Sequence, residues 1–257
     1  MKETAAADTD LAYLDHEFMA SDDARPLRII AEYLDPLRRL RRQCIHDTIV
    51  FFGSARLTEE GPLGRYYTEA RELARLITTW SSGLSSNLHR FVICSGGGGG
   101  IMEAANRGAR DGGGRTIGLN ISLPHEQQPN RFVTPELLFK FRYFFMRKLW
   151  FAHLARAMVV FPGGFGTLDE LMEVLTLAQT QKLARKLPVV LYGSGYWREI
   201  INFEALARHG MISREDLQLF AFADDPAGAL KLLQNAIEVG AEEKTPAFAQ
   251  SRCRGAP

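Results

Sequence analysis

The strongest constraint on the fold is a regular alternation of short apolar runs with longer helical segments, which begins near Thr48. The apolar runs are continuous, as is typical of strands that are covered on both faces. Six strands are predicted, at residues 49–53, 91–95, 116–121, 158–161, 189–192 and about 217–222. Helices are predicted between them, at about residues 65–80, 101–111, 136–155, 168–184, 196–208 and 226–238. Such repeats predict an α/β fold: a single Rossmann-like, doubly wound parallel sheet with helices on both faces.

The segments on either side of these repeats have a different character. Residues 1–24 contain seven acidic residues and one lysine. Residues 25–42 are basic, and the spacing of their apolar side chains predicts an amphipathic helix, broken near Pro36. It is interpreted as a packing helix, with a partner-binding face as the alternative. We therefore expect an N-terminal helical extension at residues 1–46, the Rossmann-like domain at residues 47–239 and a disordered tail at residues 240–257.

Charge and cysteine usage exclude several classes of protein. The chain of 257 residues has 31 Lys and Arg against 30 Asp and Glu, so its net charge of +1 gives no sign of nucleic acid or an anionic membrane as a partner. No apolar run approaches the roughly 20 residues of a membrane span, and the acidic N-terminus lacks an apolar signal core. Cys44, Cys94 and Cys253 are far apart, which favours a reducing compartment. We expect a cytoplasmic protein without a metal site, because the six histidines show no zinc-binding spacing.

A first glycine loop, residues 96–100, follows the predicted strand 91–95 and precedes a predicted helix. Helix N-termini present unpaired amides that suit phosphate, so Gly97 and Gly98 are candidate ligand-binding residues. A GxGxxG dinucleotide fingerprint fails here because Ile101 or Met102 occupies its last position, and the GK[ST] of a P-loop is absent. A tight turn between strand and helix remains the alternative.

A second loop, FPGGFGTLDE, has the same arrangement of strand, glycines and helix. Gly163, Gly164 and Gly166 allow backbone amides to converge on a ligand, and Thr167 adds a hydroxyl. The segment TLDE also has the spacing of a capping box, with Thr167 as N-cap and Glu170 at the third helical position. Alternatively, Glu170 lies one turn into a helix whose N-terminus holds a phosphate, within reach of a sugar. The spacing leaves both interpretations open.

Arg147 lies in an aromatic segment, FKFRYFFMRKLWF. On a helix, its neighbours three and four residues away are Tyr143, Phe144, Trp150 and Phe151. An arginine among aromatic side chains must extend to solvent or find an anion, because an unpaired buried charge is costly. The interpretations are a structural ion pair, or an arginine directed at a bound anion or at a catalytic carboxylate.

Four segments together resemble the LONELY GUY family: GGGGGIMEAANRGA, TIGLNISLPHEQQPN, MRK and PGGFGTLDE. The resemblance covers about residues 48–238. Members are nucleoside 5′-monophosphate phosphoribohydrolases, long labelled "possible lysine decarboxylase". The resemblance implies hydrolysis of the N-glycosidic bond of AMP or a cytokinin riboside 5′-monophosphate. No motif for a lysine-bound pyridoxal phosphate is present, so no cofactor is expected.

The resemblance also implies roles for individual residues. Arg147 and Glu170 correspond to the family's catalytic pair, and whether Arg147 orients Glu170 or binds phosphate or ribose is open. Contacts with the nucleotide are implied for Glu126, Lys148, Gly164, Phe165, Gly166, Thr167 and Thr176. Gly163, Gly97 and Gly98 join them as loop residues. A homodimer with sites near the subunit interface is also implied.

Two other functions remain on the same fold. A non-catalytic nucleotide-binding or carrier protein would retain its ligand without turning it over, since function belongs to the site and not to the fold. A dinucleotide-dependent dehydrogenase is disfavoured by the failed fingerprints. The presence of both Arg147 and Glu170 favours the enzyme.

Overall fold

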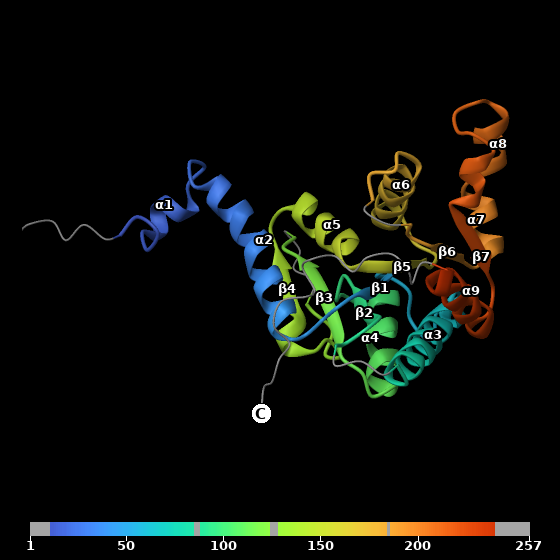
Figure 1. Ribbon diagram of the computed structural model, residues 1–257, viewed down its shortest axis with the longest axis horizontal. Helices are drawn as coiled ribbons and strands as arrows, with labels where there is room; N and C mark the ends of the chain where they lie inside the picture. The colour runs from blue at the N-terminus through green and yellow to red at the C-terminus, as the bar shows by residue number, and fades with distance from the viewer. Residues whose placement is uncertain (1–10, 85–87, 124–127, 184–185, 240–257) are drawn as a thin grey trace, which may run out of the picture.

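The computed structural model describes residues 11–84, 88–123, 128–183 and 186–239, and the strands within these ranges form one parallel sheet (Figure 1). The sheet order is β4-β3-β2-β1-β5-β6-β7, and all neighbouring strands pair in parallel. Chain order therefore runs outward in both directions from the junction of β1 and β5. The strands are β1 Thr48–Phe52, β2 Val92–Ser95, β3 Thr116–Ile121, β4 Leu138–Phe141, β5 Ala155–Val160, β6 Val189–Tyr192 and β7 Phe220–Ala223.

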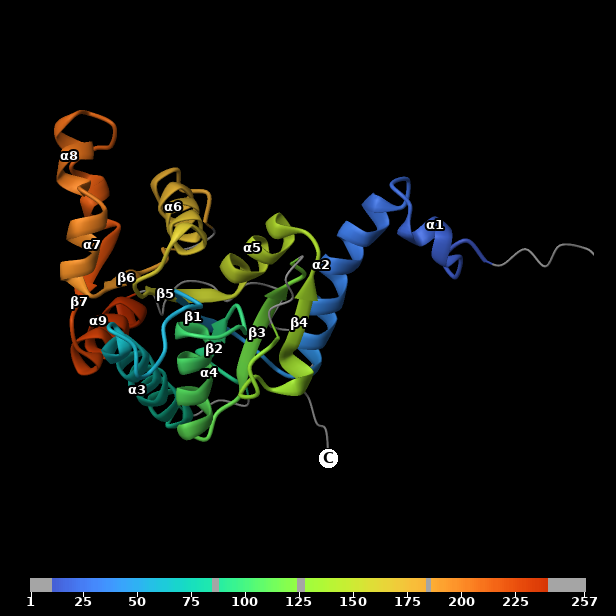
Figure 2. The same ribbon diagram turned by 180° about the vertical axis from the view of Figure 1, so that it is seen from behind.

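Helices cover both faces of this sheet, which confirms the doubly wound α/β fold (Figures 1 and 2). On β1, Ile49 and Phe51 join one apolar cluster while Val50 and Phe52 join the other, because successive side chains on a strand point to opposite faces. The first cluster packs under α3 Gly64–Ser82, α4 Ile101–Asp111 and α9 Pro226–Val239. The second packs under α2 Arg25–Arg42, α5 Phe144–His153, α6 Phe165–Gln179 and α7 Ser194–Ile200.

The expected helix at residues 136–155 is wrong over its first eight residues and its last two. A short 3₁₀ helix, Pro135–Leu137, leads into strand β4, and α5 begins only at Phe144 and ends before β5. In β4, Phe139 and Phe141 are buried while Lys140 is exposed, which is the alternation of an edge strand with one covered face. The dense aromatic residues of this segment also fit a helical spacing. The segment forms a strand because it pairs with β3.

The expected break of the N-terminal helix at Pro36 is also wrong, because α2 runs through this proline without interruption. Proline has no amide to donate to the carbonyl four residues earlier, which belongs to Glu32. The indole Nε1 of Trp150 on α5 donates to that carbonyl instead, at 3.1 Å. The packing of α2 against the domain therefore supplies the hydrogen bond that the proline removes.

Smaller differences concern the remaining element boundaries. The expected helix 196–208 is two helices, α7 and α8 Phe203–Arg208, and the side chain of Asn202 caps the second by accepting from the amide of Ala205. A five-residue helix, α1 His16–Ala20, precedes α2 and extends away from the sheet (Figure 1). The predicted tail at residues 240–257 lies outside the described residues. The division into extension and domain stays a prediction.

Two further expectations concern membranes and cysteines. Within the described ranges, no helix combines the length and apolarity needed to cross a membrane. Cys94 is a free, buried thiol, whereas Cys44 is disulfide-bonded.

Candidate active site

The candidate site lies where the order of strands reverses, at the carboxyl ends of β1 and β5. In open parallel sheets, ligands bind outside this edge at the reversal. Ser54, just after β1, joins the two glycine loops there. Its amide donates to the carbonyl of Pro162 at 3.0 Å, and its carbonyl accepts from the amide of Ile101 at 3.0 Å. Both loops are therefore held at one place by the backbone of a single residue.

The first glycine loop is largely buried and is occupied by contacts with the protein. The carbonyl of Gly97 accepts from the amide of Asn130 at 2.8 Å, and the carbonyl of Gly98 accepts from the Asn130 side chain at 2.8 Å. Gly97 has a φ of +70°, and a Cβ there would lie 3.1 Å from the Cα of Gly118. These contacts fit a tight turn, but they involve the carbonyls and not the amides that would bind a phosphate, so the ligand-binding role of Gly97 and Gly98 stays a prediction.

A buried polar network that sequence reasoning missed supports this loop. The side chain of Asn130 donates to Asn106 Oδ1 at 2.9 Å, and Ser95 Oγ donates to the same oxygen at 2.8 Å. Asn106 in turn donates to the hydroxyl of Thr116. The available signal was Asn106 itself, an amide side chain beside the small apolar residues that α4 buries. A buried amide of this kind requires partners, so it marks a position where the fold is specified by hydrogen bonds.

The second glycine loop is open to solvent, in contrast to the first. Helix α6 begins at Phe165, and its first intrahelical bond runs from the amide of Leu168 to the carbonyl of Gly164 at 3.0 Å. The amides of Phe165, Gly166 and Thr167 therefore have no acceptor within the helix. Gly164 and Gly166 are exposed, and a Cβ on either would meet no atom within 4 Å. This helix N-terminus is an accessible site for an anion.

The capping-box interpretation of TLDE is wrong. The N-cap of α6 is Gly164, so Thr167 is the third helical residue and Glu170 the sixth. Thr167 is instead buried against the loop, where a Cβ on Gly163 would come within 2.1 Å of its hydroxyl. Since the helix starts two residues before Thr167, Glu170 lies in the second turn and does not cap the helix N-terminus.

Arg147 and Glu170 form an ion pair between α5 and α6. The distance from Arg147 Nη2 to Glu170 Oε1 is 3.1 Å, and their side chains are only 16% and 8% exposed. The guanidinium of Arg147 lies 5.3 Å and 5.6 Å from the ring centroids of Phe144 and Phe151, which confirms two of the four aromatic neighbours predicted from the sequence. Its Nε is buried and has no hydrogen-bond acceptor among the described residues. One donor of the arginine is thus unused by this part of the protein.

Burial shifts the pKa of both partners. Desolvation raises the pKa of Glu170 to about 7, against the opposing effect of the cations of Arg147 and Lys148. Desolvation also lowers the pKa of Arg147, and Glu170 opposes that shift. A carboxyl with a pKa near 7 both holds and releases a proton at neutral pH.

The remaining predicted residues are distributed unevenly. Lys148 Nζ pairs with Asp169 at 2.8 Å and Glu173 at 2.7 Å on α6. Burial disfavours the charged ammonium, but these hydrogen bonds outweigh it and raise the pKa of Lys148. Thr176 is exposed, and its hydroxyl donates to the carbonyl of Met172 at 2.7 Å. Eleven residues separate Thr176 from the start of α6, which is about 16 Å of helix, so the fold does not bring it to the glycine loop.

Glu126 lies outside the described residues. In the part of the chain that the structure describes, no group of three or more His, Cys, Asp or Glu side chains is arranged to hold a metal ion.

The site can therefore act on a ligand with two chemically different ends. The N-terminus of α6 accepts an anionic group, and Glu170 lies five residues further on, about 7.5 Å along the helix axis. When ionised, Glu170 stabilises developing positive charge; in either state it exchanges a proton near neutral pH. Arg147 holds the carboxyl in place from the neighbouring helix.

Comparison with protein families gives one match to a family model, described as "Possible lysine decarboxylase", at residues 102–233. Curated relatives include cytokinin riboside 5′-monophosphate phosphoribohydrolase LOG3 of Arabidopsis thaliana, 28% identical over 200 residues, or 76% of this chain and 83% of the relative. LOG4 of Arabidopsis thaliana is 30% identical over 147 residues, covering 56% of this chain and 66% of the relative. LOG of Oryza sativa subsp. japonica is 32% identical over 173 residues, covering 66% and 62%. The chain thus spans just under two thirds of the length of these last two relatives.

Solved structures with a similar fold include TM1055, with a TM-score of 0.53 and 20% identity over 74% of this chain and 99% of that chain. The molybdenum cofactor carrier protein of Chlamydomonas reinhardtii has a TM-score of 0.50 and 25% identity over 75% of this chain and 99% of that chain. The first likeness concerns the fold alone.

We predict that replacing Arg147 by Met raises the pKa of Glu170 from about 7 to a higher value. Burial of the carboxyl would persist while the cation that favours its ionised form is lost. The titration is followed by ¹³C NMR of the Glu170 carboxyl in both proteins. Arg198→Met is the matched control, because Arg198 also lies over an aromatic ring, Phe222, but on α7. An unchanged or lowered pKa of Glu170 in the Arg147 variant would contradict the assigned contact.

Proposed function

The chain belongs to the family described as "Possible lysine decarboxylase", the LOG family, and we propose that it hydrolyses the N-glycosidic bond of a nucleoside 5′-monophosphate. The products are a free base and ribose 5-phosphate, and the substrate is AMP or a cytokinin riboside 5′-monophosphate. The printed activities of the curated relatives support this proposal. The observation that carries it is the buried pair of Arg147 and Glu170 beside the open N-terminus of α6.

The 5′-phosphate is held by the N-terminus of α6 in this proposal. The amides of Phe165, Gly166 and Thr167 point out of the first turn, and the helix dipole favours negative charge there. The exposed backbone of Gly164 and Gly166 leaves room for phosphate oxygens. No cluster of cations is required, which agrees with a net charge of only +1.

Glu170 acts on the ribose. As the bond from C1′ to the base nitrogen breaks, the sugar gains oxocarbenium character, which an ionised carboxylate stabilises. Glu170 also accepts a proton from the attacking water, whose oxygen bonds to C1′. The base nitrogen leaves with the electron pair of the broken bond and takes up the proton that the water gave to Glu170. Arg147 fixes the carboxyl through its 3.1 Å contact, and its unused Nε is a donor for a ribose or phosphate oxygen.

The lysine at this site is unsuited to the decarboxylase chemistry in the family label. An amine nucleophile that forms a Schiff base needs a lowered pKa. Lys148 has a raised pKa, because two carboxylates hold it as the ammonium ion. Its two ion pairs instead join α5 to α6 beside the catalytic pair.

Glu170→Gln and Arg147→Ala are each expected to lower the turnover of AMP by about 10²-fold or more, the scale typical of acid–base and electrostatic groups. Release of adenine is followed by chromatography. Glu204→Gln, an exposed acid at the start of α8, is the control and retains the wild-type rate. Adenosine tests the phosphate site, since hydrolysis of adenosine at the rate of AMP would contradict it.

The same assay separates the enzyme from a carrier. A carrier retains the nucleotide without releasing base, and the likeness to the molybdenum cofactor carrier protein makes this the second candidate. Bound AMP with no adenine release from the wild-type protein would favour it. Release of adenine at a near-normal rate by both the Glu170 and Arg147 variants would contradict the catalytic role of these residues.

Gly166→Ala is expected to raise the KM for AMP by about tenfold while stabilising the fold. A methyl group at Gly166 meets no protein atom, and alanine is favoured over glycine within a helix by about 0.5–1 kcal/mol. The methyl would occupy space that the phosphate needs. Gly195→Ala, also without neighbours within 4 Å and on α7, is the matched control. An unchanged KM would contradict the placement of the 5′-phosphate at this loop.

A homodimer is part of the proposal, with the apolar surface of α5 and α6 as the interface. Large side chains on these helices are exposed, among them Phe144 (50%), Phe145 (50%) and Leu149 (40%). Contiguous exposed apolar surface marks interaction sites. Light scattering is expected to give the mass of two chains for the wild type and of one chain for Leu149→Lys. A wild-type monomer at every concentration tested would rule out the dimer.

A further inference from the structure

Glu32, on the helix α2 that precedes the family match, makes two separate attachments to α5. Its carboxylate accepts from the backbone amides of Arg142 at 2.7 Å and Tyr143 at 3.3 Å, the two residues just before α5. Its carbonyl accepts from Trp150 Nε1 at 3.1 Å. The second bond exists because Pro36 has no amide to occupy that carbonyl.

The two attachments enclose Arg147. Tyr143 lies four residues before Arg147, and its carbonyl accepts from the amide of Arg147 at 3.2 Å. Trp150 lies three residues after it, on the next turn. The turn of α5 that carries Arg147 is thus held to α2 on both sides by one residue, Glu32.

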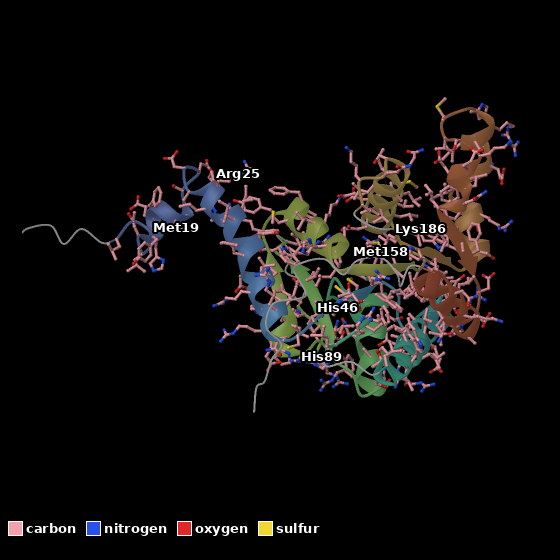
Figure 3. All side chains as sticks on the ribbon, in the orientation of Figure 1. Met19, Arg25, His46, His89, Met158 and Lys186 are labelled. Atoms are coloured by element: carbon pink, nitrogen blue, oxygen red, sulfur yellow. The ribbon has the colours of Figure 1, made fainter. Side chains whose placement is uncertain are left out.

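Other side chains of α2 reinforce this contact. Arg28 Nε donates to the hydroxyl of Tyr143 at 3.3 Å, and the guanidinium of Arg25 lies 5.7 Å from the centroid of the Tyr143 ring. The rings of Tyr33 and Trp150 lie 5.7 Å apart. Both ribbon views show α2 beside β4 and α5, and the labelled Arg25 lies at the end of α2 near α5 (Figures 1, 2 and 3).

The carboxylate is the part of Glu32 that other side chains reproduce poorly. An ionised carboxylate accepts from two amides at once, and its charge is favourable near the N-terminus of a helix. A glutamine keeps one acceptor and presents an NH₂ group to the second amide. An alanine leaves both amides without this partner.

We propose that Glu32 is a positioning residue, which sets the place of Arg147 relative to Glu170 by fixing the start of α5. The inference rests on the proposed phosphoribohydrolase function for its kinetic consequence, but not for its geometry. The Arg147–Glu170 contact is a single hydrogen bond of 3.1 Å, so a small shift of α5 breaks it. A displacement of 1 Å by a mutation far from the reaction costs as much as about 10²-fold in rate.

The kinetic test compares Glu32→Ala, Glu32→Gln and Asp35→Ala. Asp35 is the matched control, because it lies one turn along α2 and pairs with Arg38 and Arg39 of the same helix. Glu32→Ala is expected to lower kcat for AMP by about tenfold or more, with a smaller rise in KM, because the phosphate amides belong to α6 and Arg147 supplies only one further donor to the substrate. The kcat of Glu32→Gln is expected to lie between those of Glu32→Ala and the wild type. This conservative variant keeps the test valid if the alanine variant does not fold. Asp35→Ala keeps the wild-type rate.

A second readout does not depend on turnover. The charged groups that act on Glu170 are Arg147 and Lys148 of α5 and Asp169 and Glu173 of α6. Withdrawal of Arg147 leaves the burial of Glu170 in place, so its pKa rises in Glu32→Ala and stays unchanged in Asp35→Ala. The titration is followed by ¹³C NMR, and the acidic and basic limbs of the rate profile are measured alongside.

The outcomes separate the two proposals. If the wild-type protein releases no base from AMP, the proposed function is wrong. The titration of Glu170 then still tests the role of Glu32. An unchanged titration in Glu32→Ala overturns the positioning role. Equal losses of rate in Glu32→Ala and Asp35→Ala also overturn it, because they would reflect general loosening of α2. A raised pKa with a selective loss of kcat supports it.

Discussion

The ion pair between Arg147 and Glu170 is the interaction on which the site depends. Each charge is taken out of water, and such a charge is tolerated only with a partner and further hydrogen bonds. The pair joins α5 to α6, and Lys148 joins the same helices through Asp169 and Glu173. Burial that the pairing only partly offsets leaves Glu170 with a pKa of about 7, which suits it for proton transfer near neutral pH.

The two glycine loops are similar in sequence but differ in their surroundings. Both follow a strand and lead into a helix, and Ser54 holds them together. The carbonyls of Gly97 and Gly98 are occupied by Asn130, whereas Gly164 and Gly166 face open space. In the first loop glycine allows close approach of backbone to protein, and in the proposed function it allows the same approach to a ligand in the second.

Helix α2 is bonded to the domain at the position of Pro36, the residue that the sequence predicts to break it. Pro36 leaves the carbonyl of Glu32 without its helical donor, and Trp150 of α5 takes that place at 3.1 Å. Local propensity and tertiary packing oppose one another at this point, and the tertiary hydrogen bond compensates for the local loss. The helix that bears Arg147 is thereby fixed from outside the segment that the family model covers.

The sequence by itself determined the α/β class, the strand–helix alternation and the identity of Arg147 and Glu170 as candidates, because periodicity and motif spacing are local properties. It misjudged the edge strand β4 and the continuity of α2, since each depends on a partner distant in the chain, and it placed the start of α6 three residues late. Only the tertiary structure decided that Arg147 and Glu170 meet, that Thr176 lies far from the glycine loop and that Glu32 holds α5. Burial, pairing and pKa are set by neighbours in space, which a linear pattern does not contain.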